Sequence, residues 1–122
     1  MNQLKSTNSP VILIADDDRD ILSIIETILQ EDGYQTLTAS DGEQAVMLVQ
    51  THAVQLLILD IMMPKMNGDE AAKCIRKINP SIPIVAMSAQ SEYSMNQMIM
   101  NDSISKPIDE QKLNHILSKY VS

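Results

Sequence analysis

Short apolar segments alternate with segments of helical periodicity along this chain of 122 residues. Each apolar segment is short enough for a buried strand. The predicted strands are Val11–Ala15, Gln35–Thr38, Leu56–Ile61, Ile84–Met87 and a short last strand around Ile104. Strands that alternate with helices in this way predict an α/β fold, in which a five-stranded parallel sheet carries helices on both faces.

The intervening segments place apolar residues three and four positions apart, as in Ile21, Ile24 and Ile25. The predicted helices follow Asp18 or Asp20 up to Leu29, and then cover residues 43–51, 69–78, about 91–100 and about 109–120. No repeat or low-complexity tract interrupts the pattern. The sequence therefore predicts one domain over residues 10–122, preceded by a flexible lead over residues 1–9.

The composition excludes several classes of protein. A net charge of −7 argues against direct binding to nucleic acid through a basic surface. The single cysteine, Cys74, cannot form an internal disulfide, which fits a reducing compartment. No apolar run approaches the roughly 20 residues that span a bilayer, and the polar start does not resemble a secretory signal. We expect a cytoplasmic protein without a membrane segment.

Four of the predicted strands are followed closely by polar side chains. In a parallel sheet these strand ends lie at one edge, where ligands bind in folds of this class. The candidate site residues are Asp16, Asp17, Asp60, Ser88 and Lys106. Asp60 is the most informative of them, because a charge that ends the most apolar run of the chain is improbable in a simple turn.

These residue types suit phosphoryl transfer. Carboxylates that lie close together repel unless a cation joins them, and Mg²⁺ prefers such oxygen ligands. A carboxylate nucleophile at Asp60, a cation at Lys106 and a hydroxyl at Ser88 would complete the groups required. Simpler interpretations exist for single residues: Asp18 is better explained as a helix cap, and Met95 with Met98 as core packing.

Four motifs in order resemble the bacterial response-regulator receiver domain over about residues 10–121. They are Val11–Asp18, Leu57–Gly68, Val85–Ala89 and Ser105–Pro107. The resemblance implies a flavodoxin-like fold with strand order 2-1-3-4-5. It also implies a phosphoacceptor role for the aspartate at the position of Asp60.

The same resemblance implies a Mg²⁺ ion held directly by Asp17 and Asp60, through water by Asp16, and by the backbone carbonyl of Met62. Ser88 matches the family's switch hydroxyl, and Lys106 its phosphate-pairing lysine. The phosphoryl donor would be a phosphohistidine on a sensor histidine kinase or a histidine phosphotransfer protein. A downstream protein target would then read the change of conformation.

Two departures from the family are visible. Between Ser88 and Lys106 the chain is shorter than usual by about four residues, or one helical turn, so the fourth helix or its flanking loops should be truncated. Ser103 stands where the family has a switch aromatic, so we expect the output not to depend on that ring.

Three alternatives remain at this level. The chain could be a constitutive protein-interaction module whose edge residues carry no signal, or part of a hybrid histidine kinase. It could also be a Mg²⁺-dependent phosphatase, but Met62 stands where such an enzyme would carry a second acid. We therefore expect a receiver that catalyses only its own phosphorylation and dephosphorylation, not a turnover enzyme.

Overall fold

The computed structural model describes residues 9–90 and 93–121. Within these residues the chain forms five strands and four helices. In chain order they are β1 (Val11–Ala15), α2 (Arg19–Glu31), β2 (Gln35–Ala39), α3 (Gly42–Thr51), β3 (Leu56–Asp60), α4 (Gly68–Ile78), β4 (Ile84–Ser88), β5 (Asp102–Ser105) and α5 (Glu110–Tyr120). The flexible lead predicted for residues 1–9 lies outside the described residues, apart from Ser9, and stays a prediction.

The five strands form one parallel sheet in the order β2-β1-β3-β4-β5. This order confirms the flavodoxin-like topology. Strand β3 lies at the centre, and all five of its residues are buried. Strand β4 beside it is buried as well. The apolar run that ends in Asp60 is therefore the middle of the sheet.

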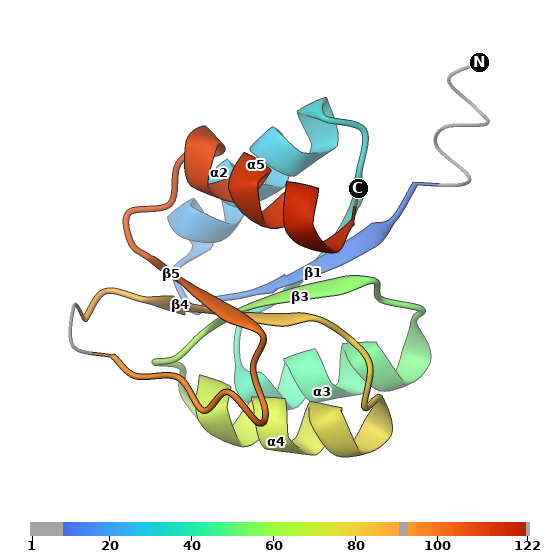
Figure 1. Ribbon diagram of the computed structural model, residues 1–122, viewed down its shortest axis with the longest axis vertical. Helices are drawn as coiled ribbons and strands as arrows, with labels where there is room; N and C mark the ends of the chain where they lie inside the picture. Colours follow the sequence, from blue (N-terminus) through green and yellow to red (C-terminus); the bar gives the residue numbers. More distant parts are fainter. Residues whose placement is uncertain (1–8, 91–92, 122) are drawn as a thin grey trace.

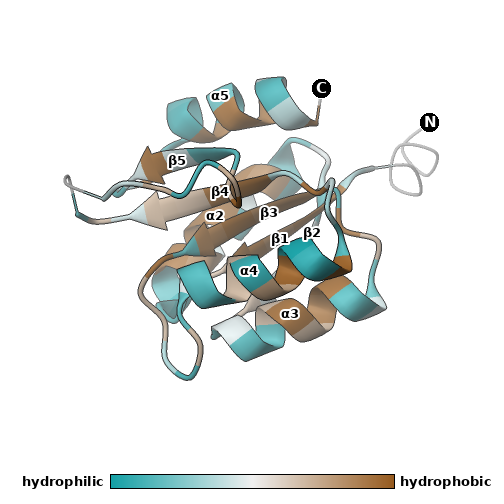
Figure 2. Ribbon diagram, turned by 60° about the horizontal axis from the view of Figure 1, so that its bottom comes forward, coloured by the Kyte–Doolittle hydropathy of each residue, from teal (hydrophilic) through white to brown (hydrophobic). Residues whose placement is uncertain are grey.

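Two helices cover each face of the sheet: α2 and α5 on one side, α3 and α4 on the other (Figure 1). Successive residues of β1 point to opposite faces, so Ile12 packs in the core beneath α2 and α5 while Leu13 packs in the core beneath α3 and α4. Strands β1, β3 and β4 are the apolar parts of the sheet, whereas β5 carries polar residues (Figure 2). No helix of the described part is long and apolar enough to cross a lipid bilayer.

Side-chain caps set where the helices begin. Asp18 caps α2 by accepting the backbone N–H groups of Asp20 and Ile21, which confirms the role predicted for it. Helix α4 begins at Gly68, one residue earlier than predicted. There the side chain of Asn67 accepts the N–H of Glu70, while the Glu70 carboxylate accepts the N–H of Asn67. This reciprocal pair fixes the first turn.

The helix predicted over residues 91–100 is wrong in its described part, because residues 93–100 form a loop that ends in a turn. Ser91 and Glu92 lie outside the described residues. The predicted truncation between the fourth and fifth strands is thereby confirmed. The interpretation of the methionine pair is wrong for Met98, whose surface is 90% exposed, whereas Met95 packs partly buried against the core.

Arg76 of α4 holds this loop in place of a helix. Its guanidinium donates to the backbone carbonyl of Ile99 from two nitrogens, at 3.0 and 2.6 Å, and to the carbonyl of Ile82 at 2.5 Å. It also donates to the side-chain oxygen of Asn101, which in turn accepts the N–H of Ile84. Four charge-assisted hydrogen bonds from one side chain thus tie the end of this loop and the start of β4 to α4.

Candidate functional site

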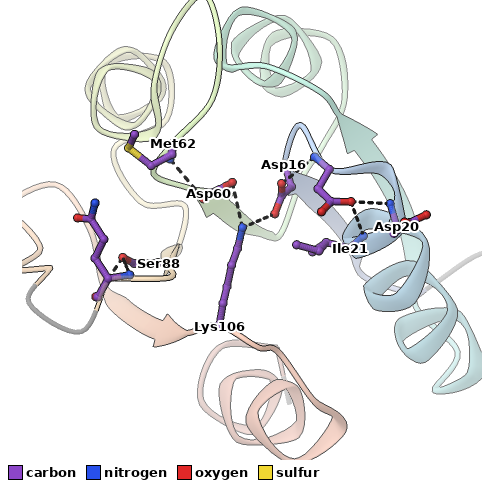
Figure 3. A network of polar contacts seen from close by, with 9 residues as sticks. Asp16, Asp20, Ile21, Asp60, Met62, Ser88 and Lys106 are labelled. Carbon is purple, nitrogen blue, oxygen red and sulfur yellow. Dashed lines mark hydrogen bonds and ion pairs between the residues drawn. The ribbon is translucent and has the colours of Figure 1, made fainter.

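The candidate site lies at the carboxyl edge of the sheet, where four strands end side by side. Asp16 follows β1, Asp60 ends β3, Ser88 ends β4 and Lys106 follows β5. In Figure 3 the Lys106 side chain extends from its strand end toward Asp60 and Asp16. The topology therefore brings Asp16, Asp60 and Lys106 together and places Ser88 at the same edge.

Three carboxylates form one cluster. Oxygen atoms of Asp16, Asp17 and Asp60 all lie within 4.8 Å of one another. Asp16 is wholly buried and Asp60 is 4% exposed, whereas Asp17 is open to solvent. Asp16 is held by the backbone N–H of Asp18, which donates to its Oδ1 atom at 2.9 Å. The cluster thus has a closed floor and an open side.

Lys106 is the cation of this cluster. Its Nζ atom lies 2.9 Å from Oδ2 of Asp16 and 3.1 Å from Oδ2 of Asp60. The contact with Asp16 lacks the geometry of a regular hydrogen bond, so Asp16 Oδ2 is a buried acceptor without one. The backbone N–H of Lys106 donates to the carbonyl of Ser88, which joins the lysine to the neighbouring strand.

Burial and charge shift two pKa values here. Burial raises the pKa of Asp60 above its ordinary value, and the nearby charge of Asp16 raises it further, against the opposing effect of Lys106. Burial alone would lower the pKa of Lys106, but the close negative charges of Asp16 and Asp60 outweigh burial and raise that pKa. Lys106 therefore stays protonated, while Asp60 ionises less readily than a free aspartate.

The backbone around Asp60 is tightly packed. The N–H of Met62 donates to Oδ1 of Asp60 at 3.3 Å, while the Met62 side chain is 66% exposed. Gly68 lies directly against this strand end, and its N–H donates to the carbonyl of Ile61 at 2.9 Å. A Cβ atom at Gly68 would collide with the carbonyl oxygen of Asp60. A glycine is therefore required for α4 to start so close to the site.

Ser88 lies at the same edge but forms no hydrogen bond with the carboxylates. Its Oγ atom accepts the N–H of Gln90 at 3.0 Å and donates to the Gln90 carbonyl at 3.3 Å, so the hydroxyl is bonded within its own turn (Figure 3). Beside it is a small cavity of about 110 Å³, lined also by Tyr93, Ser103 and Ile104. The structure thus separates Ser88 from the cluster of Asp16, Asp60 and Lys106.

The residues at this edge fit a divalent metal ion. Three carboxylates and one ammonium leave a formal charge of −2, which a divalent cation balances. The donors are hard oxygen atoms, the kind that Mg²⁺ prefers, and one of them is the buried Asp16 oxygen that has no regular hydrogen bond. The exposed side at Asp17 leaves room for water ligands.

Sequence reasoning gave no role to several residues around the site. Lys112 of α5 bonds the turn that carries Lys106. Tyr93 donates its hydroxyl to Asp69 of α4 at 3.2 Å. Both contacts join segments that no local pattern connects. The sequence offers one signal for the Lys112 contact: this lysine lies in the first turn of the helix that follows the last strand.

The comparisons with known proteins agree with this geometry. The sequence model of the response regulator receiver domain matches residues 12–118. The chain belongs to this family. The receiver domain of the sensor histidine kinase PA1611 from Pseudomonas aeruginosa, solved with a magnesium ion in its active site cleft, superimposes with a TM-score of 0.85 at 27% identity. It covers 92% of this chain and 97% of that one. The chemotaxis protein CheY4 of Vibrio cholerae gives 0.86 at 25% identity, over 93% and 99%.

Two kinds of longer relative share this receiver domain. The autoinducer 1 sensor kinase/phosphatase LuxN of Vibrio campbellii is 32% identical over 96% of this chain, and the transcriptional regulatory protein PhoP of Bacillus subtilis is 32% identical over 84%. The chain spans only 14% of LuxN and 45% of PhoP. Receiver domains are signalling modules that accept a phosphoryl group in a phosphorelay, and that is the function of this chain.

Proposed function

We propose that Asp60 is the phosphoacceptor, and that Asp16, Asp17 and Lys106 make its phosphorylation possible. The single observation that carries this assignment is the position of Asp60. It is a buried carboxylate at the end of the central strand, 3.1 Å from a lysine ammonium and clustered with two further carboxylates. Asp16 shares the burial, the lysine contact and the cluster, but of the described aspartates only Asp60 also ends the central strand.

In the proposed reaction a carboxylate oxygen of Asp60 attacks the phosphorus atom of a phosphohistidine. A P–O bond forms and the P–N bond breaks, with its electron pair staying on the imidazole of the donor. The Lys106 ammonium, already 3.1 Å from the nucleophile, then pairs with an oxygen of the incoming group. Ser88 could donate to another oxygen only after its hydroxyl leaves the carbonyl of Gln90.

We assign a Mg²⁺ ion to the carboxylates of Asp16, Asp17 and Asp60 and to the backbone carbonyl of Met62. When bound, it supplies positive charge that neutralises the phosphoryl oxygens. The buried Oδ2 atom of Asp16 supports this assignment, because a metal ion or a metal-bound water would give it a partner. The magnesium ion in the receiver of PA1611 gives a precedent in a structure of the same fold.

The donor must place a phosphohistidine beside Lys106, and an apolar groove lies next to that residue. The groove has a volume of about 390 Å³ and is lined by Ile21 and Ile24 of α2, together with Ala89, Pro107 and Ile108. Lys106 lines it too, so the groove is continuous with the site. We propose that a histidine kinase or phosphotransfer protein docks here through an apolar surface around its histidine.

The test is phosphorylation by acetyl phosphate in MgCl₂, followed by mass spectrometry of the intact protein and of its peptides. We expect one phosphoryl group on wild type, located at Asp60, and none on Asp60→Asn. A matched control is Asp69→Asn, which changes an aspartate on α4 outside the carboxylate cluster. Equal phosphorylation of wild type and Asp60→Asn would refute the assignment.

Two other functions are separated by further measurements. If the protein were a constitutive interaction module, its Asp60→Asn variant and its phosphorylated wild type would bind the protein target with the same affinity. In a phosphorylation-dependent receiver the two affinities would differ. A turnover phosphatase would release many phosphates per protein molecule from a phosphomonoester. We expect only slow loss of the protein's own phosphoryl group, because the Met62 side chain offers no general acid two residues after Asp60.

A further inference from the structure

The turn between β5 and α5 carries Lys106, and a second lysine holds this turn. The Nζ atom of Lys112 lies 2.9 Å from the carbonyl oxygen of Ser105 and 2.8 Å from that of Pro107. It also lies 3.4 Å from the Ser105 hydroxyl. Ser105 and Pro107 are the two neighbours of Lys106 in the chain. One ammonium group therefore bonds the backbone on both sides of Lys106.

Lys112 is itself fixed at the start of α5. Its backbone N–H donates to Oδ1 of Asp109, the residue that caps the helix. The third residue of a helix is an unfavourable place for a cation, because the N-terminal end of a helix carries partial positive charge. A lysine at this position is not explained by helix formation. The two carbonyl groups that it bonds supply the compensation.

We propose that Lys112 is a positioning residue for Lys106 in the phosphorylation of Asp60, an inference that rests on the proposed function. None of the contacts described for Lys112 is with the carboxylates of Asp16, Asp17 or Asp60. It acts through the turn, by restricting the backbone from which the Lys106 side chain extends. With the N–H of Lys106 bonded to the carbonyl of Ser88, three bonds then define that backbone. A fixed cation is worth more in the transition state than a mobile one.

This role differs from simple attachment of α5 to the sheet, and the chain offers a matched control. Lys119, also on α5, forms an ion pair with Asp102 of β5 at 2.8 Å. It therefore joins the same two elements as Lys112 does. It lies near the end of α5 and bonds neither neighbour of Lys106. A general loosening of α5 should slow phosphorylation in both Lys112→Met and Lys119→Met. An effect that acts through Lys106 should slow it only in Lys112→Met.

The experiment compares Lys112→Met, Lys112→Arg and Lys119→Met with wild type. Acetyl phosphate is varied at saturating MgCl₂, and the rate constant at saturating donor is separated from the KM. Mg²⁺ affinity is measured by calorimetry, and thermal unfolding checks that each variant is folded. We expect Lys112→Met to lower the rate constant about tenfold or more, with little change in Mg²⁺ affinity. Lys112→Arg should recover much of the rate, and Lys119→Met should keep it.

A wild-type rate constant for Lys112→Met would overturn the inference, and so would equal losses in Lys112→Met and Lys119→Met. If Lys112→Met does not fold, Lys112→Gln takes its place, because an amide still donates to one of the two carbonyls and should give an intermediate rate. Failure of the proposed function itself has another signature: Asp60→Asn and Lys106→Met would both be phosphorylated as wild type is.

Discussion

Oδ2 of Asp16 lies 2.9 Å from Nζ of Lys106, and this ion pair is the polar contact that the described residues give to that buried oxygen. The same ammonium lies 3.1 Å from Asp60. One lysine thus neutralises part of the charge of two buried carboxylates, while the exposed Asp17 adds a third negative charge. The fold holds these charges in place before any ligand arrives.

Mg²⁺ should stabilise the protein through this cluster. At a free Mg²⁺ concentration ten times the Kd, binding adds about 1.4 kcal/mol to the free energy of unfolding. That corresponds to a rise in Tm of roughly 3–6 °C for a domain of this size. Thermal unfolding in EDTA and in MgCl₂ measures the difference. Asp16→Asn and Asp17→Asn should lose most of it.

Asp18→Asn is the matched control for this measurement. Asp18 belongs to the same run of three aspartates, but its side chain caps α2, a position where asparagine serves equally well. We expect this variant to keep the full response to MgCl₂. A full response in Asp16→Asn and Asp17→Asn would place the ion elsewhere.

Asp60→Asn should stabilise the metal-free protein at pH 7. The pKa of Asp60 is raised above its ordinary 3.8 by burial and by Asp16, so the folded state holds the Asp60 proton more tightly than the unfolded state does. The free energy of unfolding therefore falls as the pH rises from the unfolded-state pKa of Asp60 to its raised folded-state pKa. Above the folded-state pKa the loss of stability is complete. Asparagine removes this penalty, so Tm should rise.

The advantage of Asp60→Asn should shrink as the pH falls toward 4, where wild-type Asp60 becomes protonated. It should also shrink in MgCl₂, because the ion stabilises only the wild-type site. Thermal unfolding at several pH values in EDTA tests both statements. A stability difference that is the same at pH 4 and pH 7 would mean that the ionisation of Asp60 is not its cause.

Arg76→Met should destabilise the protein by about 3 kcal/mol, because it leaves the bonded carbonyls of Ile82 and Ile99 without their donor. Urea denaturation measures the change. Lys77→Met alters the next residue of α4, which is exposed, and should have little effect. A loss of similar size in both variants would point to a general weakening of α4, not to the Arg76 contacts.

The sheet and the site could be predicted from the sequence for one physical reason. Most of the strands are short apolar runs that alternate with helices, and polar residues stand at their ends, whereas the strand order 2-1-3-4-5 follows from the family resemblance. Asp16, Asp60 and Lys106 meet because of this topology alone. The early start of α4 was also readable, since Asn67 and Glu70 form a capping box by spacing.

The loop over residues 93–100 could not be predicted in the same way. Met95, Met98 and Ile99 have helical spacing, and periodicity alone favours a helix there. Long-range hydrogen bonds favour the loop instead: Arg76 donates to the Ile99 carbonyl, and Asn101 bonds the backbone of Ile84.

That the output does not need an aromatic ring at Ser103 stays a prediction. Ser103→Tyr should leave the phosphorylation rate nearly unchanged.

Ile24→Asp should separate the two kinds of phosphoryl donor. Ile24 is 54% exposed and lines the apolar groove beside Lys106, and its apolar side chain takes no part in the hydrogen bonds and ion pairs of the site. A charge at this position should weaken the docking of a protein donor, so we expect phosphotransfer from a phosphorylated kinase or phosphotransfer protein to slow by roughly tenfold, as for the loss of about 1.4 kcal/mol. Acetyl phosphate needs no docking surface, and its rate should not change.

The control is Ile78→Asp, a similarly exposed isoleucine at the end of α4. Equal rates from the protein donor in Ile24→Asp and wild type would exclude the groove as the docking surface.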